Sequence, residues 1–177
     1  MVDVVILEGP DGAGKTTLYE KYFKVFGYEC IHNGVYASPE EAYKAYREQQ
    51  EKIRKKEKVV LDRSHISQAV YGPIYRKEDH LSLQHDIVDG VFHQMRAVVV
   101  LCYTKVAKDN WKSRKNMEYI SQDHEYLQVF RAYDPRYIGR YTSLPVVVYD
   151  YTNVTGNEIV SLMDRILVIK ENFYGHG

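Results

Sequence analysis

The stretch "VVILEGPDGAGKTTLYEKYF", Val4–Phe23, decides the fold. It opens with a short, continuous apolar run, which is typical of a strand buried on both faces of a parallel sheet. A glycine-rich segment follows, and then a pattern that predicts a helix with one apolar side, made of Leu18, Tyr22, Val25 and Phe26 and ended by Gly27. The sequence therefore predicts a strand that leads through a glycine-rich turn directly into a helix.

Four more apolar, β-branched runs follow: "YECIH" (28–32), "KVVLD" (58–62), "AVVVLCY" (97–103) and "LPVVVYD" (144–150). Helical patterns separate them. One begins with Ser38 as N-cap, Pro39 at the first helical position and Glu41 closing a capping box. Two others carry apolar stripes, at 87, 91 and 95 and at 159, 162, 166 and 173. Alternating strands and helices predict an α/β fold, a parallel sheet with helices on both sides. Without a linker or repeat, residues 1–177 are expected to form a single domain.

The composition argues against several classes of partner. Lys and Arg number 24, as do Asp and Glu, so the formal net charge is zero and no global field attracts nucleic acid or an anionic membrane. Asp3 and Glu8 interrupt the N-terminal apolar stretch, and no run is long enough to cross a bilayer. The two cysteines, Cys30 and Cys102, lie in strand-like runs and are predicted to be buried thiols. We expect a cytoplasmic protein.

The segment "GPDGAGKT", Gly9–Thr16, matches the P-loop pattern of glycine, four residues and Gly-Lys-Thr. Glycines let successive backbone N–H groups converge on phosphate oxygens, and the following helix directs its positive N-terminus at the same anion. Lys15 is expected to bridge the terminal phosphates, and the Thr16 hydroxyl to bind Mg²⁺. The alternative is a glycine-rich turn without a ligand. The predicted nucleotide-binding residues are Gly9, Gly12, Ala13, Gly14, Lys15, Thr16 and Thr17.

A second polar segment, "DRSHISQAVYG", follows the run 58–62. Asp62 is expected at the carboxyl edge of the sheet beside the P-loop strand, where it can hold Mg²⁺ through water. The guanidinium of Arg63 suits the phosphate or hydroxyl oxygens of a substrate. The alternative is a local salt bridge at an exposed strand end.

"EGPDGAGKTTL" together with "DRSHISQAVYG" resembles the thymidylate kinase family of nucleoside monophosphate kinases. The third-strand motif of that family begins Asp-Arg and has a serine five positions after the aspartate and a tyrosine nine after it. Ser67 and Tyr71 hold these positions. The resemblance implies a three-layer α/β fold with a five-stranded parallel sheet of order 2-3-1-4-5. It also implies ATP, Mg²⁺, and transfer of the γ-phosphoryl group to a deoxynucleoside 5′-monophosphate.

The resemblance further implies substrate-binding roles. It places Asp11 on the acceptor side and Arg63 against the acceptor phosphate, and the family's tendency to dimerise implies a homodimer. Tyrosines are numerous, 17 of 177 residues. Among them Tyr71 and Tyr75 are predicted to line the acceptor pocket, where a ring stacks on the base.

Two departures from the family pattern concern the acceptor. After the second strand the family carries an arginine and a proline, but this chain reads "IHNGVYASPE". Asn33 and Tyr36 either take over the binding of the acceptor or are ordinary turn residues. After Tyr71 the family often has glutamine, and this chain has Gly72, which leaves room for a modified or different base. The predicted acceptor is dTMP or a related, modified pyrimidine nucleotide.

Phosphoryl transfer needs a cation near the equatorial oxygens, and the variable P-loop positions, 10–13, supply none. "NWKSRKNMEYISQDHEY", 110–126, follows the fourth predicted strand, where related kinases have a mobile lid. We expect the lid at about 112–122, with Lys112, Arg114 and Lys115 as candidate cations and Arg114 as the first choice. A solvated helix end is the alternative.

Other functions fit less well. "DRS" also resembles the acidic-Arg-Ser motif of deoxynucleoside kinases, in which the carboxylate acts as general base on a 5′-hydroxyl. A kinase acting within a polynucleotide is disfavoured by the neutral charge. A GTP-binding switch would need an Asn-Lys-x-Asp motif, which neither "YTKVAKDN" nor "DYTNVTGNE" supplies. A P-loop protein that binds ATP without turnover is a further alternative.

Overall fold

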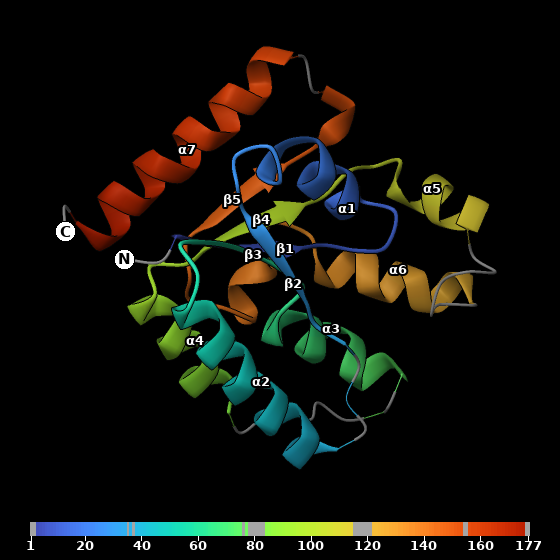
Figure 1. Cartoon of the computed structure of the whole chain (residues 1–177). Coiled ribbons are helices and arrows are strands. Elements are labelled where there is room, and N and C mark those ends of the chain that lie inside the picture. Colours follow the sequence, from blue (N-terminus) through green and yellow to red (C-terminus); the bar gives the residue numbers. More distant parts are fainter. Residues whose placement is uncertain are drawn as a thin grey trace.

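The computed structural model describes residues 3–34, 36, 38–75, 77, 84–114, 122–153 and 156–175. Its centre is a five-stranded sheet in the order β2-β3-β1-β4-β5, in which every neighbouring pair is parallel (Figure 1). The strands are β1 (Asp3–Glu8), β2 (Glu29–His32), β3 (Lys58–Asp62), β4 (Val98–Cys102) and β5 (Val146–Tyr149). The predicted fold class and strand order are confirmed.

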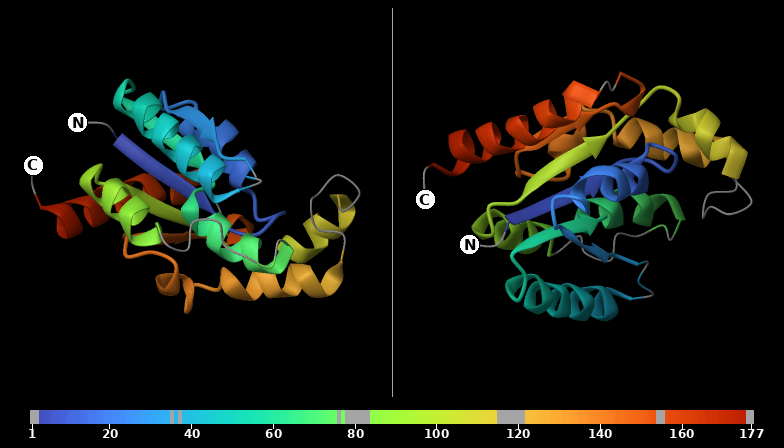
Figure 2. Two further views of the ribbon diagram at one scale, coloured as in Figure 1. Left: turned by 90° about the horizontal axis from the view of Figure 1, so that it is seen from below. Right: turned by 45° about the horizontal axis from the view of Figure 1, so that its top comes forward.

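Helices cover both faces of the sheet, as the views in Figure 2 also show. On one face lie α1 (Lys15–Leu18), the π-helical turn η1 (Tyr19–Phe23) and α7 (Gly156–Tyr174). On the other lie α2 (Pro39–Arg54), α3 (His65–Tyr75), α4 (His85–Gln94) and α6 (Asp123–Ala132). The chain also contains α5 (Ala107–Arg114) and the 3₁₀ turns η2 (Ile138–Arg140) and η3 (Tyr151–Asn153). Among the described helices, none has both the length and the apolar character that crossing a bilayer requires.

The three central strands are more completely buried than the edge strands, although Val147 and Tyr149 of the edge strand β5 are also buried. Val4–Leu7 of β1 and all of β4 are fully buried, whereas β2 lies at the edge of the sheet and is largely exposed. Cys102 in β4 is therefore buried, as predicted, but Cys30 in β2 is exposed. The prediction for Cys30 is wrong because an edge strand is covered by a neighbour on one side only.

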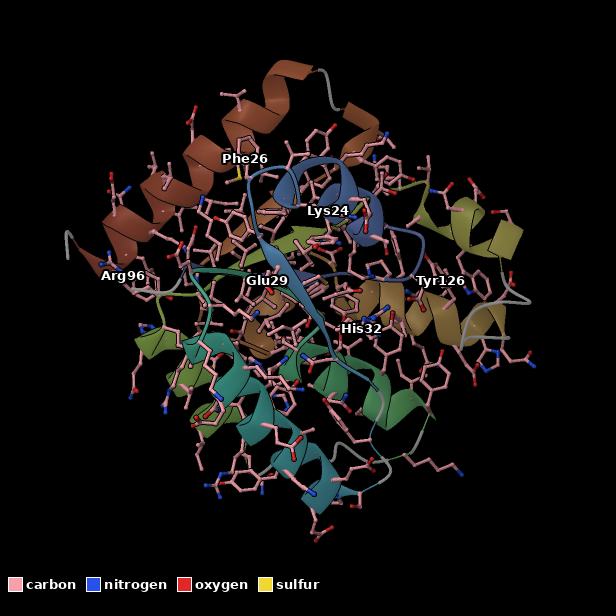
Figure 3. The ribbon with its side chains drawn as sticks, in the orientation of Figure 1. Lys24, Phe26, Glu29, His32, Arg96 and Tyr126 are labelled. Carbon is pink, nitrogen blue, oxygen red and sulfur yellow. The ribbon has the colours of Figure 1, made fainter. Side chains whose placement is uncertain are left out.

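The helix predicted after the glycine-rich turn has a different register. After four α-helical residues the backbone continues as η1, in which Lys24 N–H donates to Tyr19 O (3.0 Å), five residues earlier. The wider turn moves Phe23 onto the sheet and leaves Val25 and Phe26 exposed by 76% and 48%. Figure 3 labels Phe26 on this segment. The predicted stripe is wrong at Val25 and Phe26 because it assumed 3.6 residues per turn.

Two later stripes are also partly wrong. In α4 the core side is formed by Val88 and Phe92, while Ile87 is 60% exposed. In α7 Leu162 and Ile166 are buried as predicted, but Phe173 is 49% exposed. Adjacent apolar pairs permit two helical registers, and packing against the sheet selects one of them.

The predicted lid falls largely outside the described residues. Of 112–122, residues 115–121 are not described, and neither is the side chain of Arg114 at the end of α5. The N-cap of α2 is confirmed, because Ser38 Oγ accepts a hydrogen bond from Glu41 N–H (3.2 Å).

A buried carboxylate joins α3, α4 and the segment before β5. Asp89, 7% exposed, accepts hydrogen bonds from His65 Nε2 (3.0 Å), Ser143 N–H (2.7 Å) and the hydroxyl groups of Thr142 and Ser143. Burial acts to raise the pKa of Asp89, but hydrogen bonds from His65, Ser143 and Thr142 hold that pKa well below its usual value. The cluster fixes the start of α3, which carries several site residues.

Replacing Asp89 with alanine should therefore lower the free energy of unfolding by about 3 kcal/mol at pH 7. Because the pKa of Asp89 is lower in the folded state, its stabilisation is present above the unfolded pKa of about 3.9 and is lost as the pH falls towards the folded pKa. Urea unfolding between pH 7 and pH 2 measures both effects, with exposed Asp86→Ala as the control. If Asp89→Asn loses stability at acid pH as steeply as the wild type does, Asp89 is not the source of this pH dependence.

Candidate active site

The glycine-rich loop connects the end of β1 to the start of α1, between two close backbone neighbours. Gly9 and Gly12 have φ values of +139° and +79°. A Cβ atom at Gly9 would lie 2.1 Å from Cys102 O, and one at Gly12 would lie 2.5 Å from Ala107 O. Only glycine fits either position. The sequence thus builds the compact turn that backbone N–H groups need in order to converge on an anion.

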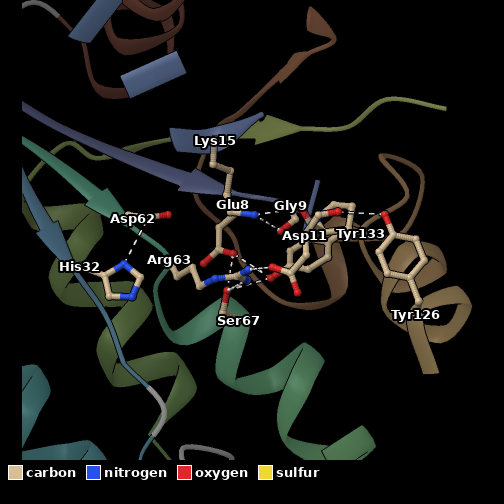
Figure 4. Close-up of polar contacts among 11 residues, drawn as sticks. Glu8, Gly9, Asp11, Lys15, His32, Asp62, Arg63, Ser67, Tyr126 and Tyr133 are labelled. Carbon is tan, nitrogen blue, oxygen red and sulfur yellow. Dashed lines mark hydrogen bonds and ion pairs between the residues drawn. The ribbon is translucent and has the colours of Figure 1, made fainter. Parts of the chain in front are cut away.

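Lys15 lies over this loop and is 8% exposed (Figure 4). Its Nζ donates hydrogen bonds to Gly9 O (2.7 Å) and Pro10 O (2.9 Å). Burial lowers the pKa of Lys15, and the neighbouring charge of Arg63 lowers it further. The ammonium group is thus held beside the loop by neutral carbonyl groups, so an incoming phosphate would offer it a better partner.

Asp62 ends β3 and faces the same region. In the sheet register it is opposite Leu7 of β1 and His32 of β2. Asp62 Oδ2 lies 3.0 Å from His32 Nδ1, and this contact raises the pKa of His32. Burial acts to raise the pKa of Asp62, but His32, Lys15 and Arg63 lower it. Its other oxygen, Oδ1, is buried and has no hydrogen-bond partner in the described structure, so half of this ionised carboxylate is left without a compensating donor.

Arg63 follows in a left-handed backbone conformation, φ +73°. Its guanidinium forms an ion pair with Asp11, donates to Ser67 Oγ (3.3 Å) and lies 4.7 Å from the centre of the Tyr71 ring. Burial alone would lower the pKa of Arg63, but Tyr71 and Asp11 hold it well above its usual value. The structure thus brings together Asp11, Arg63, Ser67 and Tyr71, which the sequence predicts as acceptor-side residues.

Below these groups lies a buried carboxylate that the sequence reasoning missed. Glu8, fully buried at the end of β1, accepts hydrogen bonds from Ser64 Oγ (2.7 Å), Ser67 Oγ (2.7 Å) and Tyr133 OH (2.8 Å). Burial and the nearby Glu8 raise the pKa of Tyr133 well above its usual value, so its hydroxyl stays a donor. Ser67 is held by this network as well as by Arg63. Tyr126 OH donates to Asp11 O (2.9 Å) on the same side (Figure 4).

Aromatic rings border the side of the site that the sequence predicts to hold the acceptor. Tyr71 and Tyr75 stack with their ring centres 6.0 Å apart and 18° between their planes. Tyr36 instead is 8% exposed and donates to Asn33 Oδ1 (3.2 Å). Asn33 is 6% exposed and donates to Arg63 O (2.6 Å). Of the two turn residues, Asn33 borders the cavity described next, and Tyr36 is not among the residues that line it.

A cavity of about 580 Å³ connects the glycine-rich loop with the Asp-Arg pair. Predicted site residues make up most of its walls: Asp11, Gly12, Gly14, Lys15, Thr16, Thr17, Asn33, Asp62, Arg63, Ser67, Tyr71 and Tyr75. Gly9, Ala13 and Tyr36 are not among the lining residues. The lining residues that the sequence did not indicate are His32, Gly34, Gln68, Asn110 and Tyr151.

Asn110 and Tyr151 pack against the glycine-rich loop and line the cavity. Asn110 Nδ2 donates to Gly12 O (3.1 Å) and also to the hydroxyl of Tyr151. A Cβ atom at Gly14 would lie 2.8 Å from the Tyr151 ring, so the ring packs directly on the loop. Asn110 comes from α5 and Tyr151 from η3, and neither segment carries a recognisable motif.

The fold and this cavity define a class: an α/β protein with the P-loop NTPase fold. No protein-family model and no curated protein sequence matches the chain. The fold resembles that of the YorR protein of Bacillus subtilis, solved in complex with phosphorylated GDP (21% identity, TM-score 0.71), with 98% of this chain and 99% of that chain covered.

Two structures named as kinases share the fold as well. Deoxyadenosine kinase from M. mycoides, solved with dATP, is 18% identical with a TM-score of 0.63, and the match covers 92% of this chain and 98% of that one. A gluconokinase from Sinorhizobium meliloti is 15% identical with a TM-score of 0.57 and coverage of 97% and 95%. At such identities the likeness shows the fold, and the residues of the site must support the function.

Proposed function

We propose that this protein is an ATP-dependent kinase that phosphorylates a deoxynucleoside 5′-monophosphate, dTMP or a related pyrimidine nucleotide. The observation that carries the proposal is one cavity lined by Lys15, Asp62 and Arg63 together with the glycine-rich loop. A triphosphate bound by the loop would direct its terminal phosphate towards the Asp-Arg pair. The activity follows from bringing a donor and an acceptor phosphate into the same enclosed space.

The acceptor end of the cavity supports an anionic acceptor. The raised pKa of Arg63 keeps its guanidinium group positively charged there. The planar set of N–H donors on this group suits the oxygens of a phosphate. The stacked rings of Tyr71 and Tyr75 offer a flat apolar surface to a base. In the reaction, an oxygen of the acceptor phosphate attacks the γ-phosphorus, the bond to the β–γ bridging oxygen breaks, and ADP leaves with that electron pair.

The residues present also fit a magnesium ion bound with ATP. Asp62 Oδ1 is a buried, ionised oxygen without a partner in the described structure, and Thr16 lines the same cavity. Mg²⁺ prefers one or two protein oxygens and completes its shell with phosphate and water. Asp62 and Thr16 would hold the ion, which supplies charge neutralisation for the terminal phosphates when bound.

A substrate panel tests the proposal directly. The protein is incubated with ATP and Mg²⁺ and either nucleosides or nucleoside monophosphates, and the products are separated by anion-exchange chromatography. We expect diphosphates from deoxypyrimidine monophosphates, at least about tenfold faster than phosphorylation of any nucleoside. Turnover of nucleosides alone would overturn the proposal.

The second candidate is a deoxynucleoside kinase, favoured by one observation. Asp62 lines the cavity, and its buried Oδ1 has no hydrogen-bond partner among the described residues, so a small opening of the site would let this carboxylate accept the proton of a 5′-hydroxyl. In that reaction Asp62 would act as general base, and Arg63 would bind the donor phosphate rather than an acceptor phosphate.

Arg114 is proposed as the lid cation that stabilises the transferred phosphoryl group. Arg114→Ala should lower kcat about a hundredfold and change KM for ATP less than about threefold, because the interaction would form mainly in the transition state. Lys112→Ala is the matched comparison, since exposed Lys112 already pairs with Asp123 (3.8 Å). Initial rates at varied ATP measure both constants. A change confined to KM would remove the assignment.

A further inference from the structure

The end of β2 holds the end of β3. His32 is opposite Asp62 in the sheet register, and one residue further Asn33 N–H donates to Asp62 O (3.1 Å). Asn33 then uses its side chain: Nδ2 donates to Arg63 O at 2.6 Å. Asn33 thus donates hydrogen bonds to both Asp62 and Arg63, one from its backbone and one from its side chain. It stands where the thymidylate kinase family, which the sequence resembles, has an arginine and a proline.

We propose that Asn33 is a positioning residue that acts through Arg63. In this role it holds the backbone of Arg63 in the left-handed conformation that directs the guanidinium into the acceptor end of the cavity. The inference rests on the proposed function, because the binding and turnover of the acceptor report on Arg63.

The conformation of Arg63 needs such support. At φ +73° the residue occupies a region that side-chain-bearing residues rarely adopt. The chain is held there from two sides, because Arg63 N–H donates to Leu7 O of β1 (3.0 Å) and Arg63 O accepts from Asn33. Without Asn33 the carbonyl loses that bond and the backbone is free to relax to negative φ. Such a rotation would move the guanidinium away from Asp11 and Ser67.

Asn33 is itself held in one orientation. Its Oδ1 accepts from Gln49 Nε2 of α2 (2.8 Å) and from Tyr36 OH (3.2 Å), so the oxygen faces two donors. A flipped amide would set its nitrogen against those donors and its oxygen against the carbonyl of Arg63. This arrangement requires one acceptor and one donor on a short planar group, which is asparagine. The surroundings therefore orient Asn33, and Asn33 orients Arg63.

A double-mutant cycle tests the proposal. Asn33→Ala, Arg63→Ala and the double variant are compared with the wild type in kcat/KM for the acceptor that the wild type uses. We expect kcat/KM to fall about thirtyfold in Asn33→Ala and further in Arg63→Ala. The double variant should have a kcat/KM within about twofold of that of Arg63→Ala. KM for ATP should stay within about twofold in Asn33→Ala. Losses that multiply in the double variant would overturn the proposal.

Gln49→Ala is the matched control, because it removes one of the two donors to Asn33 Oδ1, while Tyr36 OH remains to hold the amide in its orientation and Asn33 Nδ2 still donates to Arg63 O. A loss of less than about fivefold is expected; a loss as large as that of Asn33→Ala would mean that Asn33 only anchors α2. If Asn33→Ala does not fold, Asn33→Asp replaces it. Asn33→Asp keeps the oxygen that accepts hydrogen bonds from Gln49 and Tyr36 but lacks the N–H group that donates to Arg63 O. An effect of the new charge that is independent of Arg63 appears equally with and without Arg63, so it cancels in the cycle.

Failure of the proposed function and failure of the proposed role of Asn33 give different results. A wild type that phosphorylates no nucleotide or nucleoside refutes the proposed function before any variant is compared, and the inference falls with it. An active wild type with multiplicative losses refutes the role of Asn33 and leaves the function intact.

Discussion

Replacing Lys15 with methionine should lower kcat about a thousandfold, equivalent to about 4 kcal/mol of transition-state stabilisation. Lys15 is 8% exposed and its ammonium group is bound to two neutral carbonyl oxygens, so its charge is largely shielded from bulk water. An electrostatic interaction with a phosphate is worth far more there than at the surface. Initial rates with saturating ATP and acceptor measure the effect.

The same substitution should not destabilise the fold. Burial lowers the pKa of Lys15, which means that the folded protein disfavours its charge. Methionine matches the apolar stem of lysine as far as Cε and lacks the charged nitrogen, so the melting temperature should stay equal or rise. Exposed Lys24→Met, directly after η1, is the control and should keep kcat within about twofold. A Lys15→Met variant that keeps more than a tenth of the wild-type kcat would contradict the role of Lys15.

Local motifs predicted the parts of the site that lie within one stretch of chain. The loop from Gly9 to Thr16 needs only a strand before it and a helix after it, and both can be recognised in the sequence. The position of Asp62 beside the loop follows because parallel strands end at the same edge of the sheet. These predictions depend on backbone geometry rather than on distant side chains.

The parts that the sequence reasoning missed depend on long-range contacts. Glu8 is bound by Ser64 and Tyr133, which are 56 and 125 residues away. A carboxylate directly after a buried apolar run is a signal that a partner exists, but it does not name the partner. His32 likewise meets Asp62 only because β2 and β3 are neighbours in the sheet. Sequence spacing alone cannot identify such pairs.

The predictions of which helix side faces the core were wrong for a related reason. Periodicity assumes a regular α-helix, and the π-helical turn after α1 breaks that assumption. The turn exposes Val25 and Phe26 and buries Phe23 instead. The sequence contains no proline or glycine within this turn to indicate the change, so only packing against the sheet determines it.

Replacing Arg63 with alanine should reduce kcat/KM for a monophosphate acceptor about a thousandfold, equivalent to about 4 kcal/mol, and change KM for ATP less than about threefold. The side chain of Arg63 is only 18% exposed and is held by Asp11 and Ser67 at the end of the cavity that we propose for the acceptor. Arg63→Lys should recover only part of the loss, because an ammonium group lacks the planar fork that binds two phosphate oxygens. Exposed Arg54→Ala in α2 is the control and should leave both constants unchanged.

The acceptor used in this experiment separates the two candidate functions. If Arg63 binds an acceptor phosphate, Arg63→Ala should penalise a monophosphate at least about thirtyfold more than the matching nucleoside, because only the monophosphate loses a charged contact. If the protein is a nucleoside kinase, Asp62→Ala should be the more damaging substitution, since the proton of the 5′-hydroxyl then has no acceptor. Equal losses for monophosphate and nucleoside in Arg63→Ala would show that Arg63 does not select the acceptor.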